Sequence, residues 1–225
     1  MAKGGKTTTN DRANFKYLLQ TCLKDICSLS EDQLEALYEH YIHLSRWNQR
    51  LNLTHIVDLE TIVVRHYCES LFLGIHLPRD AASVIDIGSG AGFPGIPIAV
   101  LLPHVRVSLV ESRQRKAVFL RDSTRNLPNV TVLNCRAQSI EGSFDFLVSR
   151  AVRWQEIFSL TPRLSQRIGI LIGKRDVPYL TCVESISWQE PVCIPWSLHT
   201  ALLMGEYVSR GTAVEHPRST VPRET

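Results

Sequence analysis

One stretch of this chain, residues 82–95, constrains its fold more than any other. It opens with the β-branched residues Val84, Ile85 and Ile87, which favour a short buried strand. Gly88, Gly90 and Gly92 follow at alternate positions, where the backbone can turn tightly and come close to a ligand. A strand that runs into a glycine-rich turn and then a helix is typical of an α/β nucleotide-type site.

The spacing of these glycines narrows the choice of ligand. Phe93 stands where the dinucleotide fingerprint has its third glycine, so a pyrophosphate cradle is disfavoured. A ligand with an adenosine and no phosphate fits better, and S-adenosylmethionine is the obvious one. Glu111 ends the next predicted strand, where a carboxylate can accept hydrogen bonds from both ribose hydroxyls. The alternative to a ligand site is that the glycines form an ordinary turn and that Glu111 is simply exposed.

The rest of the chain alternates predicted helices and strands, which indicates an α/β fold. We expect a doubly wound, Rossmann-like methyltransferase sheet, mostly parallel with an antiparallel edge, preceded by an N-terminal helical cap. Ser30, with Gln33 three residues later, is typical of a capping box. The predicted helices begin near residues 11, 30, 58, 95, 113 and 154, and the predicted strands span 84–87, 105–111, 130–135, 144–149 and 168–172, with an antiparallel edge from 183–188 and 199–208.

The same pattern predicts the domain organisation. We expect a disordered N-terminus over 1–10, a helical cap over 11–78, an S-adenosylmethionine-dependent methyltransferase domain over 79–210, and a flexible tail over 211–225.

Composition and cysteine spacing argue against a membrane-spanning protein and against a zinc-binding one. With 225 residues, 44% hydrophobic and 21% charged, the chain is typical of a globular protein, and no apolar run approaches the ~20 residues that span a bilayer. Its six cysteines form no C-x-x-C pair and no zinc-like spacing, so we expect free thiols, no metal and a cytoplasmic location.

Basic residues gather where predicted strands end. In a doubly wound sheet these ends surround the ligand crevice, and positive charge there suits a polyanion such as RNA. A solvated helix face is the alternative for those on the helix after the second strand. The residues are Arg113, Arg115, Lys116, Arg121, Arg125, Arg136, Arg150, Arg153, Lys174 and Arg175.

Missing motifs limit the type of methyl transfer. No Asn-Pro-Pro-Tyr or Asp-Pro-Pro-Tyr is present, which disfavours methylation of an exocyclic amine. No Pro-Cys is present, which disfavours a cysteine adduct on a pyrimidine. A nucleophile with a free lone pair would not need a general base to remove a proton. No residue stands out in the sequence as such a base.

Taken together, residues 35–175 closely resemble the RsmG (GidB) family of bacterial methyltransferases, which methylate N7 of a guanine in 16S ribosomal RNA. The block from Asp86 to Pro97 and the Ser149-Arg150-Ala151 triplet are the most specific matches. The other matches are Asn52-Leu53-Thr54, His66 with Ser70 and Leu71, Glu111-Ser112, Phe119-Leu120 and Arg136-Ala137.

The resemblance implies an S-adenosylmethionine-dependent enzyme that acts on 16S ribosomal RNA or the small ribosomal subunit, as a monomer without a metal or membrane segment. The implied cofactor-binding residues, together with the glycine run, are Gly88, Gly90, Phe93, Glu111, Ala137, Gln138 and Arg150. The implied RNA-binding residues are Arg115, Lys116, Arg136 and Lys174, and the implied catalytic residues are Arg150, Lys174 and Arg136.

The chain also departs from the family pattern. Gln138 stands where the family usually has Glu, Arg115 where it has Lys, and Glu69 where it has Asp, and Lys174-Arg175 replaces a Lys-Gly pair. A backbone contact to adenine would survive at Gln138, whereas a carboxylate contact would not.

Several alternatives remain open at this point. Arg150 can pair with the cofactor carboxylate or hold the RNA, and Phe93 or Trp154 can stack on the target base or lie in the core. A methyltransferase for another RNA, a small molecule or a protein is one rival function. An NAD-binding oxidoreductase is another, which the glycine spacing argues against.

Overall fold

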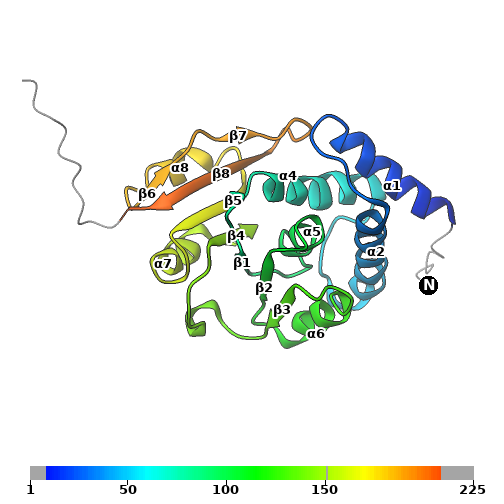
Figure 1. Cartoon of the computed structure of the whole chain (residues 1–225), viewed down its shortest axis with the longest axis horizontal. Coiled ribbons are helices and arrows are strands. Elements are labelled where there is room, and N and C mark those ends of the chain that lie inside the picture. Colours follow the sequence, from blue (N-terminus) through cyan, green and yellow to red (C-terminus); the bar gives the residue numbers. More distant parts are fainter. Residues whose placement is uncertain (1–8, 151, 209–225) are drawn as a thin grey trace, which may run out of the picture.

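The structure, a computed structural model, describes residues 9–150 and 152–208 (Figure 1). The predicted flexible tail and nearly all of the predicted disordered N-terminus lie outside these residues. The division at residue 78 into a cap and a methyltransferase domain stays a prediction.

Two long helices open the N-terminal cap. Helix α1 spans Thr9–Leu23 and α2 spans Glu31–Leu51. The predicted capping box is present, because the Ser30 side chain accepts from the Gln33 backbone and the Gln33 side chain accepts from the Ser30 backbone. Helix α2 ends at Leu51, and Asn52 caps it with a left-handed backbone conformation.

The third helical segment differs from the regular helix that the periodicity predicts. It consists of α3 (Leu59–Ile62), a π-helical turn η1 (Val63–Cys68) and α4 (Glu69–Ile75). π-Helical turns are rare and frequently lie at functional sites. The apolar positions of this segment also fit a regular α-helix, so their spacing does not reveal the extra residue of the π-helical turn.

The sheet confirms the predicted fold class. Its strand order is β3-β2-β1-β4-β5-β8-β6, with β7 also paired to β8. The first five strands are parallel, and β8 runs antiparallel to β5, β6 and β7. The strands are β1 (Ser83–Ile87), β2 (Arg106–Val110), β3 (Val130–Leu133), β4 (Phe146–Arg150), β5 (Arg167–Gly173), β6 (Ile186–Trp188), β7 (Val192–Cys193) and β8 (Thr200–Tyr207).

Helical segments follow each of the five parallel strands. They are α5 (Gly95–Leu101), α6 (Gln114–Ser123), the 3₁₀ turn η2 (Ala137–Ser139), α7 (Trp154–Leu164) and α8 (Val177–Thr181). Helix α6 begins one residue after its predicted start at residue 113. Sequence periodicity does not predict α8, η2 or β7, which are too short for a periodic pattern.

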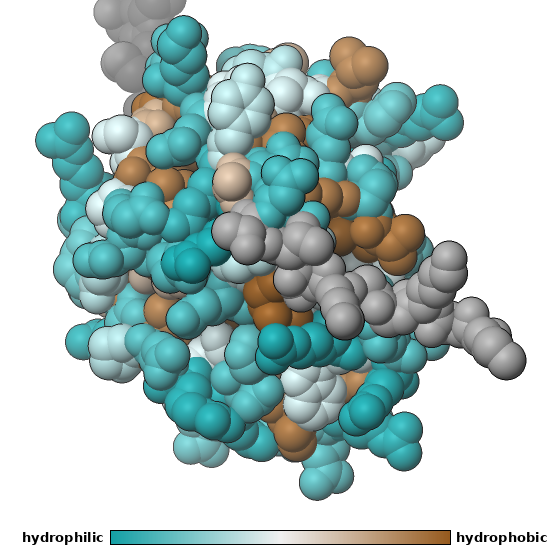
Figure 2. Space-filling view, turned by 90° about the vertical axis from the view of Figure 1, so that its right-hand side faces the viewer, coloured by the Kyte–Doolittle hydropathy of each residue, from teal (hydrophilic) through white to brown (hydrophobic). Residues whose placement is uncertain are grey.

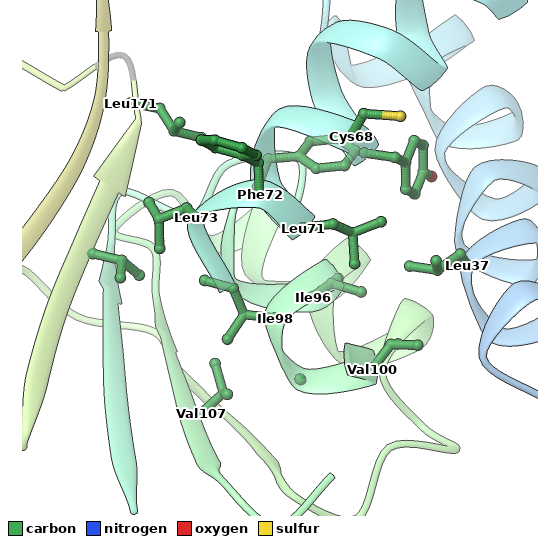
Figure 3. Close-up of a cluster of buried hydrophobic side chains, with 14 of the residues drawn as sticks. Leu37, Cys68, Leu71, Phe72, Leu73, Ile96, Ile98, Val100, Val107 and Leu171 are labelled. Carbon is green, nitrogen blue, oxygen red and sulfur yellow. The ribbon is translucent and has the colours of Figure 1, made fainter. Parts of the chain in front are cut away.

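The sheet separates two hydrophobic cores, because successive side chains of a strand point to opposite faces. On one face, Val84 and Val107 pack with residues of the cap, α5 and α6. In Figure 3, Leu71 of α4, Ile96 of α5 and Leu37 of α2 converge in this core. On the other face, Ile85 packs with residues of α7 and α8. The cap is therefore continuous with the main core.

Figure 2 shows the molecule from the side of α1 and α2, where hydrophilic residues cover most of the visible surface. The hydrophobic patches between them are small and scattered. No helix among the described residues is long and apolar enough to cross a bilayer.

A buried hydrogen-bonded chain joins the cap to the glycine-rich turn. His40 of α2 is 1% exposed, and its Nε2 lies 3.1 Å from the Ala91 carbonyl oxygen. A carbonyl only accepts, so Nε2 carries the proton and Nδ1 accepts from the Tyr67 hydroxyl at 2.8 Å. Burial lowers the pKa of His40 from 6.5 to about 3. His40 is therefore uncharged and links α2 to the glycine-rich turn by a hydrogen bond, and we call this link the His40 strut.

This strut predicts a pH-dependent stability. Between pH 6.5 and about 3 the unfolded chain binds a proton at residue 40 that the folded chain excludes, so acidification lowers the free energy of unfolding. His40→Gln keeps a donor for Ala91 but does not titrate. When the pH is lowered from 7.5 to 5, we expect the free energy of unfolding of the wild type to fall by about 2 kcal/mol relative to that of His40→Gln.

Urea unfolding at the two pH values measures this shift. Other titrating groups, including His66 and Asp86, are present in both proteins and cancel in the comparison. A difference that does not change with pH would show that His40 titrates normally in the folded protein.

Candidate active site

Two cavities open at the carboxyl edge of the parallel strands, on either side of the point where the strand order reverses. Such a reversal point is where open α/β sheets bind ligands. The glycine-side cavity, of about 470 Å³, is lined by Ile87, Gly88, Val110, Glu111, Ser112, Cys135, Arg136, Ala137, Gln138, Val152, Glu156 and Leu160. The cap-side cavity, of about 740 Å³, is lined by Ile56, Arg65, His66, Arg150, Val152, Arg153, Gln155, 170–173, Asp176, His199 and Thr200.

The glycine-rich turn forms one wall of the glycine-side cavity. Gly88 and Gly90 have positive φ angles of 75° and 53°, which favour glycine. A Cβ on Gly88 would lie 2.5 Å from Cγ2 of Val152, another residue of the cavity wall. A Cβ on Gly90 would approach only the Gly88 carbonyl, at 3.6 Å. The chain therefore leaves open space beside Gly90.

Glu111 ties the turn to the end of β2. One carboxylate oxygen accepts from the Gly90 N–H at 3.2 Å, and the other accepts from the Arg113 N–H at 2.7 Å. The residue is only 7% exposed, yet it lines the cavity. Each carboxylate oxygen has a second lone pair, so Glu111 can accept two further hydrogen bonds from a ligand.

Asp86 holds the end of the glycine-rich turn by a hydrogen bond. It is fully buried at the end of β1, and its Oδ2 accepts from the Gly95 N–H at 3.1 Å. Burial raises the pKa of Asp86 to about 7, although the Gly95 N–H favours the charged form. Asp86 belongs to the block that resembles the family, but the sequence does not predict its hydrogen bond to Gly95.

The turn after β3 forms the opposite wall of the glycine-side cavity. Ala137 and Gln138 lie in η2, and both line the cavity. Arg163 of α7 donates to the carbonyls of Ala137 at 3.0 Å and Gln138 at 3.2 Å, and also to that of Ile140. This clamp joins residues 23 to 26 positions apart, so no local sequence signal could have revealed Arg163.

Arg150 lies at the edge of the cap-side cavity and pairs with the cap. Its Nη2 is 2.7 Å from Oε2 of Glu69, which is fully buried in α4. Burial lowers the pKa of Arg150, and the negative charge of Glu69 opposes that change. The second guanidinium nitrogen, Nη1, is buried without a hydrogen-bond partner among the described residues. Arg150 therefore still offers a donor to a ligand.

The ring of Phe93 lies inside the protein. It is 5% exposed and packs against His40, His66 and Tyr67, with the His66 ring stacked at 4.8 Å. The ring therefore lies in the core, and the predicted role of Phe93 in cofactor binding stays a prediction. Nothing is described of the Trp154 side chain, so a stacking role for that residue is untested.

The four predicted RNA-binding residues do not converge on one point. Arg136 is exposed and lines the glycine-side cavity, whereas Lys174 lies just after β5 and donates to the Ser197 carbonyl at 3.1 Å. Arg115 and Lys116 lie on α6, and neither lines either of the two cavities. None of the four has an ion-pair partner among the described residues, so their charge is available to a polyanion. Over the same residues no His, Cys, Asp and Glu side chains gather into a metal site.

Known protein sequences match this chain over the same region. The sequence model of the GidB family, described as rRNA small subunit methyltransferase G, matches residues 33–175. A protein of Nitrosomonas europaea, named Ribosomal RNA small subunit methyltransferase G, is 40% identical over 161 residues, which cover 68% of this chain and 74% of that protein. A protein of the same name from Roseiflexus sp. strain RS-1 is 42% identical over 132 residues, 55% of this chain and 56% of that protein. The chain therefore aligns with little more than half of the Roseiflexus protein.

Solved structures are similar to this chain in fold. A SAM-dependent methyltransferase from Aquifex aeolicus has a TM-score of 0.54 and 14% identity, over 66% of this chain and 93% of that one. A ribosomal protein L11 methylase from Lactobacillus delbrueckii subsp. bulgaricus has a TM-score of 0.51 and 14% identity, over 63% of this chain and 79% of that one. At such low identity these likenesses show the fold alone.

The family match covers more than half of the chain and contains every residue that lines the glycine-side cavity. It also contains Arg150 and its partner Glu69. The chain belongs to the rRNA small subunit methyltransferase G (GidB) family.

Proposed function

We propose that this protein transfers a methyl group from S-adenosylmethionine to N7 of a guanine in 16S ribosomal RNA. The observation that carries the proposal is the glycine-side cavity, bounded by a glycine-rich turn and by a buried carboxylate with free lone pairs, in a chain of this family. A mass-spectrometric or reverse-transcription map of modified guanines, in cells with and without the protein, tests it directly.

The residues fit S-adenosylmethionine. Open space beside Gly90 leaves room for the ligand, and Glu111 can accept hydrogen bonds from the two ribose hydroxyls. Ala137 and Gln138 offer backbone groups to adenine at the opposite wall. The unpaired Nη1 of Arg150 suits the carboxylate of the methionine part. Bound there, the cofactor supplies a methyl group on a positively charged sulfur.

Guanine N7 needs little chemical assistance from the protein. Its lone pair is free, so no proton has to be removed before it attacks the methyl group. The described residues therefore act by positioning, with reacting atoms held ~3–3.5 Å apart and in line. The cap-side cavity is lined by Arg65, Arg150 and Arg153, whose charge suits RNA, and the attack of N7 itself uses no general base.

We propose RNA as the substrate, rather than a protein or a small molecule, because of the unpaired basic residues and the family match. The L11 methylase shows that this fold also serves a protein substrate, so the fold alone does not choose. Arg115, Lys116, Arg136 and Lys174 carry charge with no carboxylate partner among the described residues, which favours a polyanion. We also infer that the protein works as a monomer and in the cytoplasm, where its ribosomal substrate is made.

The cofactor site predicts the effect of filling the space beside Gly90. In Gly90→Arg a long side chain fills the open space beside Gly90, next to the Gly88 and Glu111 wall of the glycine-side cavity, so we expect S-adenosylmethionine binding to fall below detection by calorimetry. Gly142→Arg is the matched control, because Gly142 also has a positive φ but its Cβ would meet no atom within 4 Å. Equal affinity in both variants would contradict the assigned site, and tight NAD binding by the wild type would favour an oxidoreductase.

The RNA site predicts a change in salt dependence. Replacing Arg115 and Lys116 by alanine should reduce the slope of log affinity against log salt by about one unit for each phosphate contact that the substitutions remove. Cofactor affinity should not change. The control is Arg106→Ala, an exposed arginine at the opposite end of β2. If the double variant keeps the slope of the wild type, the two residues belong to a solvated helix face.

The position of Arg150 predicts a loss of cofactor affinity. Arg150→Lys keeps a positive charge beside Glu69 but loses the planar guanidinium, which can donate two parallel hydrogen bonds. We expect the fold to persist, turnover to fall strongly, and S-adenosylmethionine binding to weaken by ~1.5–3 kcal/mol. Arg106→Lys should change neither quantity. If cofactor affinity holds while RNA affinity falls, Arg150 contacts the RNA instead, and wild-type turnover would exclude both roles.

A further inference from the structure

The cap-side cavity holds features that cofactor binding leaves unexplained, and the inference drawn from them rests on the proposed function. Its walls come from the cap, through Arg65 and His66 of η1, and from the ends of β4 and β5. Val152 lines both cavities, so a ligand in one lies next to a ligand in the other. The methyl acceptor must occupy such a neighbouring site.

One wall of this cavity is a flat ring held in a fixed plane. The His66 ring is stacked on Phe93 at 4.8 Å, with 20° between the planes. Its Nε2 lies 2.9 Å from the Thr54 hydroxyl oxygen, which also accepts from the Ile56 N–H at 3.1 Å. A ring fixed by packing on one side and by a hydrogen bond at its edge is pre-organised to stack on a ligand.

The His66 ring is also uncharged. Burial, together with the nearby charges of Arg150 and Arg65, lowers the pKa of His66 to about 3. Methylation at N7 moves the positive charge of the sulfonium onto the guanine ring. A neutral aromatic surface can stack on the neutral base before transfer and on the cationic base afterwards. A protonated histidine would repel the product.

Arg65 supplies charge beside this ring. It is exposed, it lines the cavity, and no carboxylate pairs with it among the described residues, whereas Arg150 has Glu69. An unpaired guanidinium on a cavity lined by both apolar and polar residues suits a phosphate that is attached to a base inside.

We propose that the cap-side cavity receives the target guanine nucleotide flipped out of the RNA, with the base stacked on His66 and a flanking phosphate bound by Arg65. The cap is then part of the RNA site, and Phe93 acts behind His66 as a positioning residue.

Three variants at this wall test the stacking. His66→Leu removes the flat ring, so we expect kcat/KM for unmethylated small ribosomal subunits to fall at least about 10-fold. His66→Phe keeps the ring but loses the hydrogen bond to Thr54, and Thr54→Val loses the same bond with the ring intact. Both should stay within about threefold of the wild type. S-adenosylmethionine affinity should be the same in all four proteins.

A charge variant tests the phosphate contact and does not disturb the buried ring. Arg65→Ala should reduce the salt slope of subunit binding by about one unit. Arg79→Ala is the control, because Arg79 is also exposed but precedes β1 at the opposite edge of the sheet.

The outcomes separate this inference from the proposed function. If the wild type methylates the subunits but His66→Leu matches it, or His66→Phe falls as far as His66→Leu, the stacking role is overturned. An unchanged salt slope in Arg65→Ala overturns the phosphate contact even if His66→Leu fails to fold. If the wild type transfers no methyl group to the subunits, the proposed function has failed and this inference fails with it.

Discussion

The structure depends on holding one glycine-rich turn, residues 88–95, in place. The turn contains three glycines at positive φ and borders the glycine-side cavity, so its backbone has much conformational freedom to lose. Other elements restrain it: Glu111 of the β2 end accepts from the Gly90 N–H, Asp86 of β1 accepts from the Gly95 N–H, and His40 of the cap donates to the Ala91 carbonyl. Two of these three partners are fully or almost fully buried, so their bonds are made away from competing water.

This arrangement makes the cap part of the site. His40 fixes the turn, Glu69 balances the charge of Arg150, and His66 forms a wall of the cap-side cavity. All three come from helices that precede the first strand. Core residues of the cap also continue into one face of the sheet, so the cap cannot move away without opening the main core. In the proposed reaction, a cap that is fixed in this way would position the RNA base as rigidly as the strand ends would position the cofactor.

The sequence predicts what depends on local pattern and misses what depends on distant partners. Period-two alternation and β-branched runs predict the five parallel strands, and Ser30 with Gln33 predicts the start of α2, because these signals lie within a few residues of one another. The Glu69–Arg150 pair, the His40 strut and the Arg163 clamp each join elements that lie far apart in the sequence. The ring of Phe93 illustrates the same limit: the motif marks the residue, but only the packing shows that it faces the cap.

The departure at residue 138 can be understood from the turn that contains it. The first N–H groups of a helical turn have no partner within that turn, so those of Ala137 and Gln138 can donate to a ligand. Arg163 fixes the carbonyls of the same two residues from the other side, which keeps the N–H groups in place regardless of the side chain at 138. An adenine recognised by these backbone donors does not require a carboxylate there. Gln138 is therefore compatible with cofactor binding, since the backbone that Arg163 clamps does not change when Glu is replaced by Gln.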